Sequence, residues 1–91
     1  MPHAFEELVE KQRAADQAHQ QVDELRHAYG PPTEHEWTKQ QTATYETALR
    51  AWRDLDRDVQ SALAQYAKER GRSRPEVQTE VESAVRRTEH Q

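Results

Sequence analysis

The feature that most constrains this chain is the position of its helix-breaking residues. The sequence holds two glycines and four prolines, and all but Pro2 gather at two points, Gly30-Pro31-Pro32 and Gly71 with Pro75. Glycine and proline interrupt regular secondary structure. The segments between these points are rich in alanine, glutamate, glutamine and arginine, which favour the α-helix. No alternating strand pattern occurs, so the sequence predicts an all-α chain of three helices.

The first helix is predicted over residues 4–28, and the second over residues 34–70. Thr33 and Glu36 match a capping box, which places the start of the second helix just after the two prolines. Along the first helix, apolar residues recur at spacings of three, four and seven, which is one helical stripe. They are Leu8, Ala15, Ala18, Val22, Leu25 and Tyr29.

A heptad-like apolar face runs along the second helix. The residues that recur every seven positions on it are Tyr45, Trp52, Val59 and Tyr66. A short connection makes the first two helices antiparallel neighbours. If the turn centres near Pro32, Ala15 lies beside Trp52 and Leu8 beside Val59.

The third helix is predicted over residues 76–87, with a polar tail at 88–91. Ser73 and Glu76 match a second capping box, and proline is tolerated in the first turn of a helix. In this antiparallel pairing, the first helix extends only as far as Ala62 of the second helix. Later apolar residues of the second helix are therefore left uncovered. We therefore expect the third helix to fold back over that open end and to complete a three-helix bundle-like fold.

The composition supports a single small domain, residues 1–91, with a limited core. Hydrophobic and charged residues each make up 33% of the chain, and the mean hydropathy is -1.28. A chain of this length and polarity buries little apolar area, so the hairpin alone is marginal. Burial of a second face, through a dimer or a partner helix, would stabilise it. We therefore expect a protein partner or self-association.

Several classes of protein are not expected. The net charge of -4 does not favour non-specific binding to DNA or to an anionic membrane. The chain has no cysteine and no apolar run long enough for a membrane span or a signal peptide. We expect a cytoplasmic protein.

No catalytic or cofactor-binding pattern is found. His19, Asp23 and His27 lie one turn apart in sequence, but the two histidines are two turns apart and cannot share a metal ion without further ligands. A run of alternating charges, including Glu46, Arg50, Asp54 and Asp58, is typical of a solvated helix face. Neither a phosphate-binding loop nor a nucleophile motif occurs. We therefore expect no enzyme, no cofactor, no metal site and no small-molecule substrate.

The preferred interpretation is a non-enzymatic helical protein that acts through protein–protein interaction, as a scaffold, adaptor or oligomerisation module. Aromatic residues and arginine are favoured anchors at protein interfaces. The seven-residue spacing of the aromatics favours core packing, so whether they are buried or exposed stays open. The candidate partner-binding residues are Trp37, Tyr45, Arg50, Trp52, Arg53, Arg57 and Tyr66.

Residues 62–87 offer an alternative. Glu69-Arg70-Gly71-Arg72-Ser73, followed by Glu76, Val77 and Val81, resembles the helix–turn–helix half of ribbon-helix-helix DNA-binding proteins. That family reads bases with a strand before its first helix, and this chain has a predicted helix there. The resemblance implies phosphate contacts at Ser73 and Arg74. The candidate nucleic-acid-binding residues are Lys68, Arg70, Arg72, Ser73, Arg74, Arg86 and Arg87.

Overall fold

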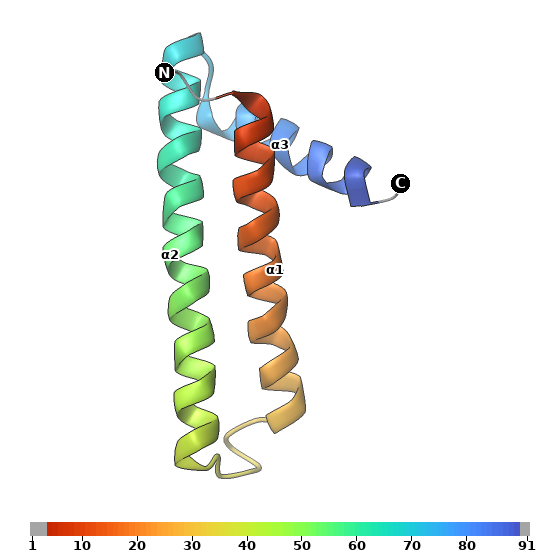
Figure 1. The fold of residues 1–91 in the computed structure, drawn as a ribbon, viewed down its shortest axis with the longest axis vertical. Coiled ribbons are helices and arrows are strands. Elements are labelled where there is room, and N and C mark those ends of the chain that lie inside the picture. The colour runs from red at the N-terminus through yellow and green to blue at the C-terminus, as the bar shows by residue number, and fades with distance from the viewer. Residues whose placement is uncertain (1–3, 90–91) are drawn as a thin grey trace.

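The computed structural model describes residues 4–89. Helix α1 spans Phe5–Tyr29, α2 spans Lys39–Arg70 and α3 spans Arg74–Glu89. Figure 1 shows α1 and α2 side by side in opposite directions, with α3 crossing them at the end where the described chain begins. No strand occurs among the described residues. The predicted all-α fold, a long hairpin with a third helix at its open end, is confirmed.

Helix α1 agrees with the predicted range 4–28 to within one residue at each end. It ends at Gly30, whose φ of 78° is a conformation that residues with a Cβ rarely adopt. The Gly30 amide donates to the Arg26 carbonyl at 3.0 Å, which satisfies one of the last carbonyls of the helix. Glu6 and Glu7 in the first turn complement the positive end of the helix dipole.

The predicted range 34–70 for the second helix is wrong at its start. The capping box expected at Thr33 does not form, and α2 begins at Lys39. The box that does form joins Thr38 and Gln41. The Thr38 hydroxyl accepts from the Gln41 amide at 3.0 Å, and the Gln41 side-chain oxygen accepts from the Thr38 amide at 3.0 Å.

The side chain of Trp37 gives the physical reason for this shift. Its ring packs between Tyr29 and Tyr45, with ring centroids 5.4 and 5.1 Å away. Its indole N–H donates to the Gly30 carbonyl at 2.9 Å. These contacts require residues 30–38 to fold back over the tip of the hairpin, and a helix starting at residue 34 would carry Trp37 away from them.

The longer connection also shifts the pairing of α1 and α2 by about one helical turn. The predicted neighbours were Ala15 and Trp52, but the ring of His19 lies against Trp52, at 4.8 Å between centroids. Lys11 forms a 2.7 Å ion pair with Asp58. The hydrogen bond that Lys11 donates to Asp58 raises the pKa of Lys11 above its ordinary value. A shift of one turn leaves the same stripe of each helix facing its partner, so the hairpin survives the error in register.

Helix α3 begins at Arg74, two residues before the predicted range 76–87, and it continues through Thr88 and Glu89 of the predicted tail. His90 and Gln91 lie outside the described residues. The predicted capping box is confirmed, because the Ser73 hydroxyl accepts from the Glu76 amide at 3.3 Å and the Ser73 amide donates to a Glu76 carboxylate oxygen at 3.4 Å.

The hydrophobic core lies at the open end of the hairpin, where α3 covers it. Leu63, Val77 and Val81 are completely buried there. Phe5 and Leu55 pack against this core from its edge. The predicted cover of α3 over Leu63, Tyr66 and Ala67 is therefore confirmed. The core cluster consists of Leu8, Val9, Ala15, Val59, Ala62, Leu63, Tyr66, Ala67, Val77, Val81, Ala84 and Val85.

The molecule is elongated, with extents of 49 × 27 × 20 Å. Its radius of gyration is 16.1 Å, whereas a compact domain of this length has about 12 Å. The long hairpin causes this difference, because α3 crosses only one end of it (Figure 1). Within residues 4–89, no helix combines the length and the apolar character that crossing a bilayer would need.

Candidate functional site

The half of the hairpin that α3 does not reach, residues 16–57, is here called the distal arm. Val22 is its only buried side chain, and α2 has no buried residue before Val59. Two helices alone cover one side of each other, so the rest of a wide apolar face stays partly in water. The half-buried apolar side chains of the arm are Ala18, Leu25, Tyr29, Trp37, Tyr45, Ala48, Leu49, Trp52 and Leu55.

Two of the candidate aromatics close the tip of the hairpin. Trp37 makes the contacts with Tyr29 and Tyr45 described above, and Arg26 donates a 2.9 Å hydrogen bond to the Tyr45 hydroxyl. This hydrogen bond raises the pKa of Arg26 above its ordinary value. The Arg26 guanidinium also lies 6.0 Å from the centre of the Tyr45 ring. Trp37 and Tyr45 therefore have a structural role at the tip.

The other two candidate aromatics differ in burial. Tyr66 is 8% exposed, packs 6.3 Å from the Phe5 ring, and lies 4.4 Å from the Arg70 guanidinium. It belongs to the core. Trp52 is half-buried on the distal arm, with one edge against His19. Of the four predicted aromatics, Trp52 is the one best placed to contact a partner.

The three candidate arginines, Arg50, Arg53 and Arg57, lie together on the outside of α2. They surround the half-buried side chain of Leu49, together with Glu46 and Asp54. All three are exposed. We call Arg50, Arg53, Arg57 and Leu49 the arginine face.

The expected charge ladder along this face does not form. Asp58 pairs across the hairpin with Lys11 instead. Within the part of the chain that the structure describes, no ion pair or side-chain hydrogen bond engages Arg50, Arg53 or Arg57. The three cationic groups therefore lie beside the carboxylates of Glu46 and Asp54 without forming an ion pair with either.

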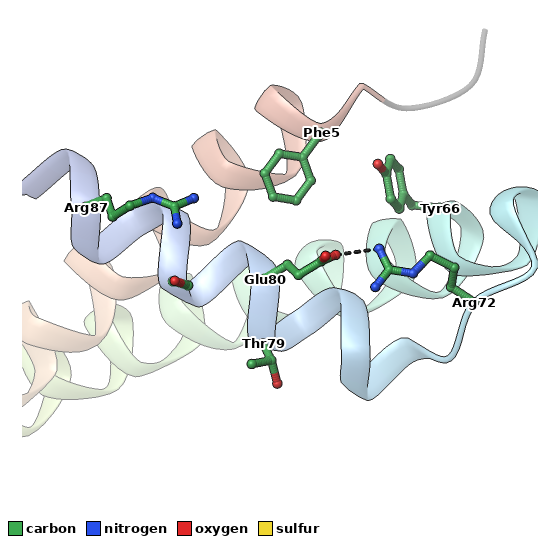
Figure 2. Close-up of a pocket in the computed structure, with 7 residues that line it drawn as sticks. Phe5, Tyr66, Arg72, Thr79, Glu80 and Arg87 are labelled. Carbon is green, nitrogen blue, oxygen red and sulfur yellow. Dashed lines mark hydrogen bonds and ion pairs between the residues drawn. The ribbon is translucent and has the colours of Figure 1, made fainter.

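An open groove of about 550 Å³ lies where α3 meets the start of α1 and the end of α2. Figure 2 shows Phe5 and Tyr66 on one side of it and Glu80 of α3 reaching toward Arg72. The two form an ion pair, and its hydrogen bond raises the pKa of Arg72. These two charges neutralise each other, which leaves the guanidinium of Arg87 as the remaining charge in the lining. Its lining residues are Phe5, Tyr66, Arg72, Thr79, Glu80, Ser83 and Arg87.

The basic turn, residues 68–74, is largely occupied by contacts inside the chain. Besides pairing with Glu80, Arg72 lies 3.8 Å from Glu76, and Arg74 donates a hydrogen bond to Gln60. Arg70 lies over the ring of Tyr66, and Ser73 is the cap of α3. Within the described range, no ion pair or side-chain hydrogen bond engages the exposed side chains of Lys68, Arg86 and Arg87.

The histidines do not assemble into a metal site in the described range. His19 lies 3.4 Å from Asp23, and His27 is two turns farther along α1. No group of three or more metal-ligating side chains forms among residues 4–89. His3 and His90 lie outside the described residues.

Sequence reasoning missed an acidic patch on the outside of α1. Asp23 and Glu24 lie there beside Ala28, with Gln20 and His27 around them. We call Asp23, Glu24 and Ala28 the acidic face. The sequence contained a signal for this patch, because Asp23 and Glu24 are adjacent on a predicted helix. Its relation to the arginine face requires the three-dimensional pairing of α1 and α2.

Comparison of the chain with protein-family models, with curated proteins and with solved structures finds no match. The class of protein that the fold itself defines is a small all-α protein built on a helical hairpin. Any functional conclusion therefore rests on the surfaces described above.

Proposed function

We propose that this protein is a non-enzymatic interaction module whose distal arm is the surface that binds a partner protein. The observation that carries this proposal is the uneven cover of the hairpin. The open end is packed under α3, whereas Trp52 and Leu49 on the arm stay half-exposed, and Leu49 lies beside three arginines that form no ion pair within the described residues. Tryptophan and arginine dominate the energetics of protein interfaces, and a half-exposed apolar strip gains free energy when a partner covers it.

The chemistry of the surfaces supports binding rather than catalysis. In the groove beside α3, the Glu80 carboxylate and the Arg72 guanidinium are engaged with each other in an ion pair. As expected from the sequence, the proposed place of action is the cytoplasm.

The alternative, binding of nucleic acid through residues 68–74, is a weaker proposal. It is favoured by the exposed side chains of Lys68, Arg86 and Arg87. A phosphate would, however, have to compete with Glu80 for Arg72 and with Gln60 for Arg74. A nucleic-acid complex would show binding that falls steeply with added salt.

Site-specific photo-cross-linking in cells tests the proposed function. A photoreactive amino acid replaces Leu49 or Arg53 on the arm, and Ala64 or Glu69 on α2 beyond it serves as the matched control. All four positions are on one helix, and both control positions are exposed. We expect a covalent protein adduct from the arm positions and none from the control positions. Equal adducts from all four positions, or none from the arm, would contradict the proposal.

A further inference from the structure

The distal arm carries a charged surface on each helix, with the arginines beside Glu46 and Asp54 on α2 and with Asp23 and Glu24 on α1. On α2, the arginine face has no ion pair in the described part of the chain. On α1, Glu24 accepts from the neutral Gln20 amide at 3.3 Å, and Asp23 lies 3.4 Å from His19. The charge of Arg26 acts on Asp23 through space, but no arginine or lysine of the described residues forms an ion pair with either carboxylate of the acidic face.

Both surfaces border the same side of the hairpin. The contacts of His19 with Trp52 and of Arg26 with Tyr45 run across that side from α1 to α2. Asp23 lies one turn after His19 on α1. Leu49 lies one turn from both Tyr45 and Trp52 on α2, and residues one turn apart share a helix face. Asp23 of the acidic face and Leu49 of the arginine face therefore lie toward the same side of the arm.

We propose that the partner of this arm is a second copy of the same chain, with α1 of each copy against α2 of the other. This inference rests on the proposed function of the arm. In a two-fold dimer every contact occurs twice, so a surface must complement itself. Pairing α1 with α1 would bring like charges together, whereas pairing α1 with α2 places Asp23 and Glu24 against the arginine face in both halves of the interface.

The area of the molecule fits such a dimer. The accessible surface is 6651 Å², whereas a compact protein of this mass exposes about 5,500 Å². The excess, about 1,150 Å², is larger than the roughly 800 Å² that each partner buries in a standard interface. The half-buried Leu49 lies among the arginines and Ala28 beside the carboxylates, so each charged face also has an apolar floor to bury.

Sedimentation equilibrium of the full-length chain is the first measurement. We expect the mass to rise from 10.7 kDa toward twice that value as the concentration increases to about 100 µM. Because exposed charge pairs are screened by salt, the dimer should weaken when the ionic strength rises from about 0.05 to 0.5 M. A mass of 10.7 kDa at every concentration would overturn this inference.

A charge swap tests the pairing itself. The first variant carries Arg50→Glu, Arg53→Glu and Arg57→Glu, and the second carries Asp23→Lys and Glu24→Lys. Each variant alone has two faces of the same sign, so its self-association should weaken at least about tenfold. An equal mixture of the two should form a dimer again, because every acidic face then meets a basic one. The matched control, Arg86→Glu, reverses the charge of an exposed side chain on α3. Its sedimentation mass should equal that of the natural chain.

The outcomes separate this inference from the proposed function. A mixed dimer of two variants that do not self-associate supports the inference. Variants that each dimerise as the natural chain does would overturn the α1–α2 pairing. A monomeric natural chain that still gives arm-specific adducts to a different protein would overturn self-association and leave the proposed function standing.

Discussion

At the residue scale, the basic turn is explained by contacts within the chain. The side chains of Arg70, Arg72 and Arg74 lie over Tyr66, against Glu80 and against Gln60, respectively. The cluster of positive charge that the sequence displays is therefore spread among separate local partners. The positive potential that the sequence suggests is reduced at Arg72, whose counter-charges Glu76 and Glu80 lie on α3.

Gly71 ends α2 with a φ of 65° and a ψ of 34°, in the left-handed region. The Arg72 amide donates to the Ala67 carbonyl at 2.9 Å, which completes this helix end. A Cβ at position 71 would meet nothing within 4 Å, so substitution costs backbone strain alone. We expect Gly71→Ala to destabilise the fold by about 1–2 kcal/mol in urea unfolding, and Gly71→Asn to cost less. Equal stability of the alanine variant would contradict this reading of the turn.

Glu76 links the stability of the α3 start to pH. Hydrogen bonds from the Ser73 hydroxyl and amide, with the charge of Arg72, hold the pKa of Glu76 below its usual 4.5. A lowered folded-state pKa means that the ionised carboxylate stabilises the fold above the usual pKa, and that this contribution is lost as the pH falls through the lowered value. We expect Glu76→Gln to be less stable than the natural chain at neutral pH, with the difference vanishing in acid. Unfolding midpoints measured across this pH range check the prediction, and a constant difference would contradict it.

At the element scale, the two capping boxes show what sequence can decide. Gly71 fixes the end of α2, and the match to a capping box directly after it is that of Ser73 and Glu76. This box was therefore predicted correctly. Between α1 and α2, Thr33 and Thr38 both match the pattern. The choice depends on Trp37 packing over the tip, a contact between segments that the local pattern does not contain.

The two threonines give a matched test of this choice. Thr38→Ala removes the hydroxyl that accepts from the Gln41 amide and should cost about 1 kcal/mol of stability. Thr33 is exposed in the connection, so Thr33→Ala should change the free energy of unfolding by less than about 0.5 kcal/mol. Chemical denaturation of both variants measures the difference. An equal or larger loss for Thr33→Ala would place the helix start where the sequence alone predicted it.

At the scale of the whole molecule, α3 divides the hairpin into a packed end and an open arm. The sequence predicted that α3 covers Leu63 and Tyr66. The shift in register also brings Phe5 of α1 against Tyr66. The sequence did not predict the one-turn shift in register or the pairing of Asp58 with Lys11, since the length of an irregular connection is not encoded by periodicity. Of the candidate site, the arginines were predicted as a group, and Trp52 was separated from the buried Tyr66 only by the position of α3.

Because of this division, the stability lost when a leucine is replaced by alanine depends on whether the leucine lies at the packed end or on the arm. Leu63 is 0% exposed beneath α3, whereas Leu49 is half-buried on the arm, and both lie on the same helix. We expect Leu63→Ala to destabilise the chain by about 2–5 kcal/mol, because it leaves a cavity among α2 and α3 side chains. Leu49→Ala should cost less than about 1 kcal/mol in dilute solution, since water already reaches much of that side chain.

Urea unfolding at low protein concentration compares the two variants. If Leu63→Ala does not fold, Val81→Ala removes a smaller group from the same core and should still destabilise more than Leu49→Ala. A loss at Leu49 equal to that at Leu63 would mean that the arm is packed as tightly as the open end in the single chain. The arm would then have little exposed apolar surface for a partner to cover. The difference in unfolding free energy between the two leucine variants therefore also indicates how much apolar surface the arm leaves available for binding.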